Sequence, residues 1–218
     1  LDIILKNNLT NYLFLSFCIL IVINGSNFID GMNTLTVGYY LLVSIVIYYL
    51  SLNQSIILKE FSLVHLLFLL SIIFIFNFIN KIYLGDSGSY LLGFSFAIFL
   101  IDIYNLNSSI SPFFIILLLW YPCFENLFSI IRKLTIKLSP LTPDNNHLHQ
   151  LIYATLKKKK IKSQLISNNV SSLFISIVNF IIILISCINP YSTYYQIKLI
   201  IISIFLYSLI FVLIKKRL

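Results

Sequence analysis

The stretch that decides the fold is FSLVHLLFLLSIIFIFNFINKIYLGDSGS, which spans residues 61–89. Positions 61–79 carry no acidic or basic residue apart from one histidine, and most are Leu, Ile or Phe. Because a helix needs about 20 mostly apolar residues to cross a bilayer, this segment is predicted to span a membrane. The glycine, serine and aspartate that follow are predicted to form a turn at the membrane surface.

The same pattern recurs along the whole chain of 218 residues. Hydrophobic residues make up 59% of the sequence and charged residues 10%, whereas soluble domains carry about 25% charged residues. We therefore exclude a soluble domain and predict an all-α, polytopic membrane helix bundle that forms one domain over 1–218. About seven transmembrane helices are expected, at 9–24, 34–52, 61–79, 88–105, 111–130, 170–188 and 196–214.

The distribution of basic residues predicts how the bundle is oriented. If successive loops alternate between the two faces, one face receives 12 of the 15 Lys and Arg residues, in 80–87, in the basic loop 131–169 and in the tail 215–218. Loops rich in Lys and Arg stay in the cytoplasm, so this face is predicted to be cytoplasmic.

Charge and cysteine spacing exclude two further classes of site. The net charge of +8 is concentrated in a few loops rather than spread along the chain, which argues against a nucleic-acid surface. Cys18, Cys123 and Cys187 lie singly in apolar runs, a spacing that fits neither a zinc site nor a disulfide framework.

Three of the seven acidic residues stand in polar segments on the predicted cytoplasmic face. Asp30 ends the stretch SNFID at 26–30, Asp86 lies in LGDSGS at 84–89, and Asp144 lies in SPLTPDNNHLH at 139–149. A carboxylate at a membrane boundary is costly without a partner, so each is a candidate functional residue. We expect the three segments to form one polar site around a divalent metal and phosphates.

The residue types in these segments suit that chemistry. Glycines on both sides of Asp86 allow close approach of a ligand, and a helix starting near Gly88 would point its free N–H groups at a phosphate. Asp86 would supply an oxygen ligand for Mg²⁺. Asp30 likewise stands just before a glycine, and the amide of Asn27 can both donate and accept. His147 and His149 are two positions apart, which suits a loop around a phosphate better than a helical metal pair. Each segment alone could equally be a helix cap or an ordinary surface loop.

Together, the segments resemble the polyprenyl-phosphate N-acetylhexosamine-1-phosphate transferase family, also called glycosyltransferase family 4. The resemblance is carried by NFIDGM at 27–32, YLGDSGS at 83–89, and Arg132 through SP at 139–140 to PD at 143–144 and HLH at 147–149. It covers nearly all of this chain and about the C-terminal two-thirds of the family pattern. The family's upstream Asp-Asp-x-x-Asp motif has no counterpart here, and an N-terminal truncation is therefore expected.

The resemblance implies that a polyprenyl phosphate, such as undecaprenyl phosphate, attacks a UDP-N-acetylhexosamine and releases UMP during cell-envelope polysaccharide synthesis. It assigns Mg²⁺, with Mn²⁺ as an alternative, to Asp86, and a groove between apolar helices to the lipid tail. The implied catalytic residues are Asp30, Asp86, His147 and His149, and the implied substrate-binding residues are Asn27, Ser87, Arg132 and Asp144.

Other functions remain open from the sequence alone. A catalytically inactive remnant would keep the fold, a transporter would place polar groups near the middle of the bilayer, and a membrane scaffold would not bring Asp30, Asp86 and His147 together. A homodimer is a further alternative that the sequence leaves open.

Overall fold

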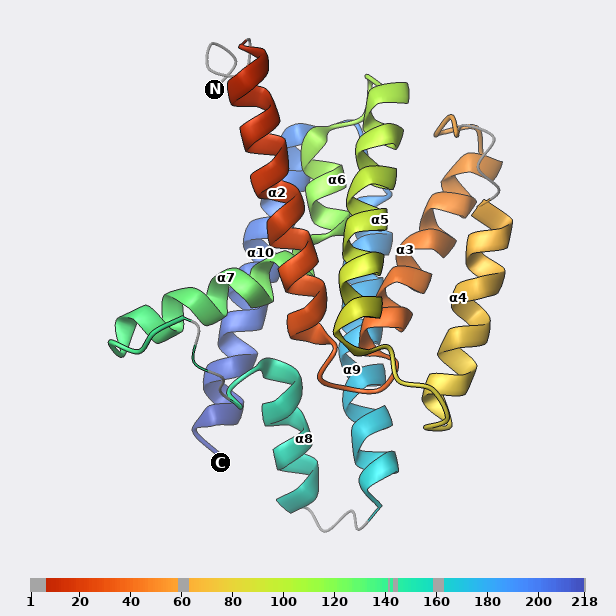
Figure 1. Ribbon diagram of the computed structural model, residues 1–218. Coiled ribbons are helices and arrows are strands. Elements are labelled where there is room, and N and C mark those ends of the chain that lie inside the picture. Colours follow the sequence, from red (N-terminus) through yellow and green to blue (C-terminus); the bar gives the residue numbers. More distant parts are fainter. Residues whose placement is uncertain (1–6, 59–62, 141, 143–144, 159–162, 218) are drawn as a thin grey trace.

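The computed structural model describes residues 7–58, 63–140, 142, 145–158 and 163–217. Every regular element in this part of the chain is helical, in agreement with the predicted all-α class. The helices, labelled as in Figure 1, are α2 (Asn8–Ile29), α3 (Leu35–Leu52), α4 (Leu63–Phe78), α5 (Gly85–Leu106), α6 (Pro112–Leu118), α7 (Trp120–Thr135), α8 (Leu148–Lys158), α9 (Gln164–Ser186) and α10 (Thr193–Lys215).

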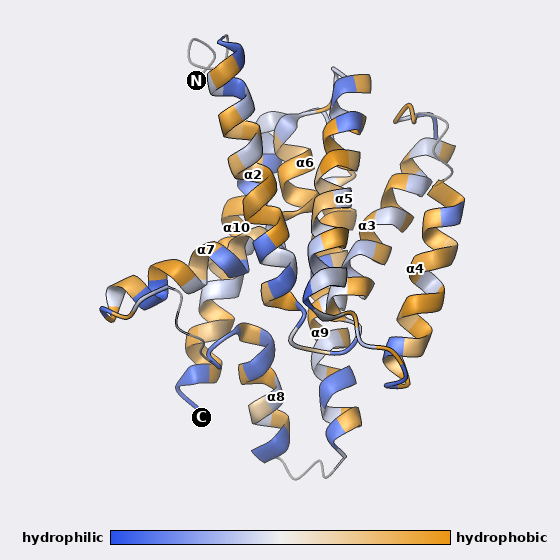
Figure 2. Cartoon of the chain, viewed as in Figure 1, coloured by the Kyte–Doolittle hydropathy of each residue, from blue (hydrophilic) through white to orange (hydrophobic). Residues whose placement is uncertain are grey.

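The bundle has the dimensions and surface of a membrane protein. Within the described residues, α2, α3, α5, α9 and α10 are each long and apolar enough to cross a bilayer, and α6 with α7 forms a sixth, bent candidate. The remaining expected span is represented by α4, which is a shorter apolar helix. Apolar residues also cover the outward faces of these helices (Figure 2), where lipid is the expected solvent. The protein is therefore a multi-pass membrane protein.

The connections divide the bundle into two ends. Segments 30–34, 79–84, 136–140 and 145–147 lie at the end that also holds α8 and the last turn of α10, whereas 53–58, 107–111 and 187–192 lie at the opposite end (Figure 1). We call the first of these the basic end, because it carries most of the Lys and Arg residues. Successive loops therefore alternate between the two ends, as the count of basic residues on each face assumed.

The candidate span over 111–130 is divided into two helices, α6 and α7. The chain bends by 75° between α6 and α7, at Leu119. The physical reason is Pro122, which has no N–H to donate to the carbonyl of Leu118 but fits well in the first turn of a new helix. Helix α7 consequently runs across the bundle direction (Figure 1). Its inner side buries a row of polar residues, namely Glu125, Asn126, Ser129, Arg132 and Lys133.

Three other boundaries differ from the sequence prediction. Helix α2 continues to Ile29, so Asn27 lies in its last turn and Asp30 is its C-cap. Helix α5 begins at Gly85 rather than near Gly88, which places Asp86 in its first turn. The basic loop 131–169 is partly helical, because it contains the end of α7, all of α8 and the start of α9.

Helix α2 packs closely against both α5 and α7 because small residues form its contact face. A Cβ atom on Gly25 would lie 2.2 Å from the carbonyl oxygen of Pro122 on α7. On the other side, a Cβ atom on Gly93 of α5 would lie 2.5 Å from Oγ of Ser26. Small residues at such crossings let helix backbones approach in a membrane. These contacts fix the end of α2, and therefore Asp30, relative to α5 and α7.

Asparagine side chains join the loops at the basic end. The N–H of Asn33 donates to Oδ1 of Asn168 at 2.8 Å, and Nδ2 of Asn33 donates to Oδ1 of Asn80 at 2.8 Å. Asn77 accepts from the N–H of Thr34 and donates to the carbonyl of Ile82. The loop that follows Asp30 is thereby tied to the loop that precedes Asp86.

Candidate functional site

A polar cavity of about 530 Å³ opens at the basic end of the bundle. It is lined by the last turn of α2, the first turns of α5, the end of α7 and parts of the segment 140–150. Three of its walls therefore come from the three motif regions that the sequence singled out. The polar side chains among its lining residues are Asn24, Asn27, Asp30, Asp86, Tyr90, Lys133, Thr142, His147 and Gln150.

The two aspartates of this cavity interact with each other. Burial raises the pKa of Asp30 to about 7, the hydroxyl of Thr36 opposes this shift, and the negative charge of Asp86 adds to it. Asp30 is held in place as the C-cap of α2, where its N–H donates to the carbonyl of Asn27 at 3.1 Å. Two carboxylates that repel each other in one cavity form a natural site for a cation.

The position of Asp86 favours an anion nearby as well. Gly85 precedes it with φ +66°, a conformation that glycine adopts without strain, and helix α5 starts there. The free N–H groups and the positive end of the helix dipole at this terminus favour phosphate oxygens. Asp86 itself is exposed in the first turn, so a metal bound to it could also be reached by phosphate oxygens.

Lys133 is the cationic residue of the cavity, and sequence reasoning missed it. Its Nζ atom donates to the carbonyl oxygens of Pro140 at 3.1 Å and Thr142 at 2.7 Å, and lies 5.9 Å from the centre of the Phe28 ring. It therefore holds the segment after α7 against α2. In the sequence it looked like one of many basic residues that set the topology, and no local signal separated it from them.

Arg132, which the resemblance assigned to substrate binding, does not line the cavity. It is buried on α7, and its Nη2 atom is 3.5 Å from Oγ of Ser129, to which it donates. Successive residues of a helix point about 100° apart, and on α7 the side chain that lines the cavity is Lys133 rather than Arg132. The rotation of α7 about its axis presents Lys133.

His147 lines the cavity and is anchored from behind by a carboxylate. Its Nδ1 atom lies 2.9 Å from Oε1 of Glu125, which is fully buried on α7. Glu125 also accepts from the N–H of Leu148 at 3.3 Å and from the hydroxyl of Tyr207 at 2.7 Å. The ring of His147 packs at 5.2 Å from that of Phe28.

His149 lies behind the cavity wall instead of in it. Its ring stacks on that of His147 at 5.6 Å, and a Cβ atom on Gly31 would come within 2.6 Å of its Nε2 atom. Burial lowers the pKa of His149 to about 4, while the charge of Glu125 opposes this shift and that of His147 adds to it. His149 is therefore a neutral packing residue near neutral pH, whereas His147 reaches the cavity.

The remaining predicted site residues are placed as follows. Asn27 lines the cavity beside Asp30, whereas Ser87 is exposed on α5 and does not line it. Asp144 lies outside the described residues. The structure thus brings together Asn27, Asp30, Asp86 and His147 at one cavity, and adds Lys133, Tyr90, Thr142 and Gln150 to them.

The residues present fit a magnesium ion that shares its ligands with a substrate. No group of three His, Cys, Asp or Glu residues that could hold a metal alone occurs among the residues that the structure describes. Mg²⁺ commonly takes one or two protein carboxylates and completes its shell with water and substrate phosphates. The pair formed by Asp30 and Asp86 meets that requirement.

A second, apolar groove of about 270 Å³ lies between α2, α5, α6 and α7. Residues 15–22 of α2 form one wall, on a different face of that helix from the residues that line the polar cavity. The opposite walls come from α5, α6 and the first half of α7; Ala97, Ile116 and Leu127 represent them. Two of the free cysteines, Cys18 and Cys123, face this groove.

These features define a class of protein: a multi-pass membrane helix bundle with a polar cavity at its basic end and a separate apolar groove between its helices. The comparison with known families agrees with this class. Residues 2–104 match the family model described as glycosyl transferase family 4, in agreement with the resemblance drawn from the motifs at 27–32 and 83–89.

Curated relatives carry related names. The chain is 32% identical over 138 residues, 61% of this chain and 38% of the relative, to a probable undecaprenyl-phosphate N-acetylglucosaminyl 1-phosphate transferase of Bacillus subtilis (strain 168). It is 29% identical over 147 residues to an undecaprenyl-phosphate alpha-N-acetylglucosaminyl 1-phosphate transferase of Thermotoga maritima, covering 67% of this chain and 44% of the relative. The chain therefore spans less than half the length of these relatives. No solved structure matches it.

Proposed function

We propose that the protein transfers N-acetylhexosamine 1-phosphate from a UDP-sugar to undecaprenyl phosphate or a similar polyprenyl phosphate, and releases UMP. The observation that carries this proposal is the polar cavity at the basic end, where two aspartates and a lysine suit a diphosphate. The separate apolar groove, which also has walls from α2 and α7, suits an isoprenoid tail. The names of the curated relatives support undecaprenyl phosphate as the acceptor and N-acetylglucosamine 1-phosphate as the transferred group.

The reaction needs little covalent chemistry from the protein. An oxygen of the lipid phosphate attacks the β-phosphorus of the UDP-sugar, the bond from that phosphorus to the bridging oxygen breaks, and UMP leaves with that oxygen. Mg²⁺, when bound, neutralises the negative charge that develops on the phosphates. Asp30 and Asp86 would hold this ion, and the N-terminus of α5 would orient the phosphates beside it.

The other cavity residues would act on the position of the substrate. Lys133 supplies a positive charge and holds Pro140 and Thr142 in place through two hydrogen bonds to their carbonyl oxygens. Asn27 offers both a donor and an acceptor to the nucleotide-sugar. His147 would contact the phosphates. Holding the two reacting phosphates together in this way is the main source of rate enhancement in phosphoryl transfer.

The proposal includes the location of the site. Loops rich in Lys and Arg remain in the cytoplasm, so the basic end and its cavity would face the cytoplasm of a bacterial inner membrane, where UDP-sugars are available. The lipid phosphate would lie at the membrane surface, while its tail enters the groove between α2 and α7.

The test uses membranes that contain the full-length gene product. UMP release from UDP-N-acetylglucosamine is measured with added undecaprenyl phosphate and Mg²⁺, for the wild type and for Asp86→Asn. Loss of a metal ligand is expected to slow release by about 100-fold or more, since it removes several kcal/mol of charge stabilisation. The matched control is Asp102→Asn, the same change at the opposite end of α5. Equal rates for Asp86→Asn and the wild type would remove Asp86 from the metal site.

A further inference from the structure

Glu125 is a fully buried carboxylate that the proposed reaction does not use directly. Its side chain is 1% exposed and accepts three hydrogen bonds, from His147, Leu148 and Tyr207. Burying a charge in this way is costly unless it is fully hydrogen-bonded. An apolar residue could fill the same space without that cost, so the position of the carboxylate calls for a reason other than packing.

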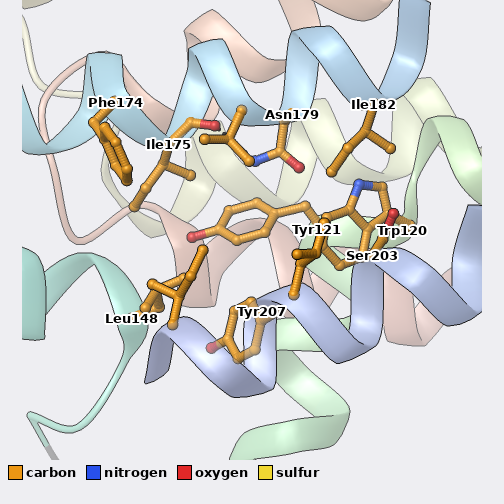
Figure 3. Close-up of a pocket in the computed structure, with 12 residues that line it drawn as sticks. Trp120, Tyr121, Leu148, Phe174, Ile175, Asn179, Ile182, Ser203 and Tyr207 are labelled. Carbon is orange, nitrogen blue, oxygen red and sulfur yellow. Dashed lines mark hydrogen bonds between the residues drawn. The ribbon is translucent and has the colours of Figure 1, made fainter. Parts of the chain in front are cut away.

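The anchor of Glu125 comes from the last helix of the bundle. Tyr207 of α10 donates its hydroxyl to Oε2 of Glu125 at 2.7 Å. Its ring is clamped by other rings, with centroids 5.0 Å from Phe124, 5.2 Å from Phe128 and 6.5 Å from Tyr121. In Figure 3, the hydroxyl ends of Tyr121 and Tyr207 both point toward the side on which Leu148 lies. The packing of these rings therefore fixes the Tyr207 hydroxyl that holds the Glu125 carboxylate.

The other oxygen of Glu125 faces the cavity wall. Oε1 accepts from the N–H of Leu148 and lies 2.9 Å from Nδ1 of His147. A carboxylate without a proton can only accept, so Nδ1 must carry the hydrogen of that bond. Nε2, on the far edge of the imidazole, is directed away from Glu125. The arrangement sets both the orientation of the ring and the position of its proton.

We propose that Glu125 and Tyr207 are positioning residues for His147: they hold a proton on Nδ1 and present Nε2 to the polar cavity, where it accepts from a hydroxyl of the ligand as the neutral imidazole and donates to a phosphate oxygen as the imidazolium. This inference rests on the proposed function for the identity of the ligand. It assigns to α10, which lies outside the segment matched by the family model, a part in shaping the site. A carboxylate that orients a histidine typically changes activity or affinity by about 10- to 100-fold when removed.

The first test reads the imidazole directly and needs no substrate. The full-length protein is labelled with ¹⁵N-histidine in lipid nanodiscs at pH 8, and the His147 signals are assigned by their loss in His147→Gln. We expect Nδ1 to be protonated and Nε2 to be unprotonated in the wild type. Glu125→Gln should keep this state, because the amide oxygen can still accept, whereas Glu125→Leu should shift the proton toward Nε2. A wild type with its proton on Nε2, or an unchanged state in Glu125→Leu, would overturn the proposal.

Tyr207→Phe covers the case in which Glu125→Leu does not fold. It removes one hydroxyl and leaves the ring cluster intact, so the His147 signals should broaden through increased motion of the ring. Tyr195→Phe is the matched control, because Tyr195 is on the same helix and donates to the carbonyl of Ile185 far from the cavity. Identical His147 signals in the wild type and Tyr207→Phe would remove Tyr207 from the inference.

The second readout is UMP release by the same variants. Glu125→Leu should slow release by about 10-fold or more, Glu125→Gln should restore most of the rate, and Tyr195→Phe should leave it unchanged. If the wild type releases no UMP, the proposed function fails while the imidazole measurement still decides the role of Glu125. If release is fast and equal in all variants, the positioning role fails while the proposed function stands.

Discussion

Single residues at the basic end differ in function because they differ in surroundings. Asp30 is half-buried and close to a second carboxylate, whereas Asp86 is exposed at a helix terminus. His147 lines the cavity, whereas His149, two positions later, is packed behind it. Two predictions follow from these differences, one for each pair.

Cation binding should depend on pH through Asp30. Because the pKa of Asp30 is raised to about 7, a proton competes with the cation below that pH. Affinity for Mn²⁺, measured by electron paramagnetic resonance on the full-length protein, should rise as pH increases from 6 to 8 and fall by up to about tenfold per unit below the pKa. Asp30→Asn should bind more weakly and without this pH dependence. An affinity of the wild type that does not vary over this range would contradict the assignment.

Stability in acid should depend on His149. Its pKa is lowered from 6.5 to about 4 by burial, so between these values the unfolded chain binds a proton that the folded protein excludes. Stability from this group is therefore present above pH 6.5 and is lost as pH falls toward 4. Thermal unfolding should show a smaller loss between pH 7.5 and 5 for His149→Phe than for the wild type. The pKa of Asp30 is raised, so its contribution to stability changes with pH in the opposite direction. That contribution is the same in both proteins and does not affect the difference between them. Parallel losses would indicate that His149 is protonated when folded.

At the scale of elements, the site depends on how closely α2 approaches α7. Gly25→Ala should force these helices apart, because the new Cβ atom would lie 2.2 Å from a backbone oxygen that cannot rotate away. We expect a loss of about 1–3 kcal/mol in the free energy of unfolding. Gly88→Ala is the control: the atoms nearest its Cβ atom would belong to the side chain of Leu84, which can move, and not to a backbone. Equal stabilities of the two variants in detergent would show that the crossing tolerates a methyl group.

The loops that carry the two aspartates should be coupled through their asparagines. Asn33→Ala and Asn80→Ala each break the bond between the two side chains, which is 2.8 Å long. Because both remove the same interaction, the double variant should lose less stability than the sum of the single losses, by about 0.5 kcal/mol or more. A double-mutant cycle of unfolding free energies measures this difference. Strict additivity would mean that the two loops are held independently.

At the scale of the whole molecule, the basic end should lie on one side of the membrane. Single cysteines that replace Lys137 or Lys216 should react with a membrane-impermeant maleimide only after the cells are permeabilised. Cysteines that replace Asn53 or Asn189, at the opposite end, should react in intact cells; all four positions are exposed. The native cysteines are replaced first. Labelling of Lys137→Cys in intact cells would place the polar cavity outside the cytoplasm and exclude a cytosolic sugar nucleotide as its ligand.

Sequence alone established the helical membrane architecture, the basic end and the convergence of Asp30, Asp86 and His147, because hydropathy and charge are properties of short segments. A run of apolar residues of bilayer length has few alternatives to a helix, since lipid cannot satisfy free backbone groups. Alternation of successive spans then places every second loop on the same side.

Tertiary structure decided which neighbouring residue faces the site. The bend at Leu119 turns α7 across the bundle, and the rotation of that helix presents Lys133 to the cavity while burying Arg132 and Glu125 behind it. Adjacent residues on a helix differ by about 100° in direction, so the choice depends on the packing of α2 and α10 against α7, which involves residues far away in sequence. The sequence therefore determined where the site lies, and the packing of the helices determined which side chains form it.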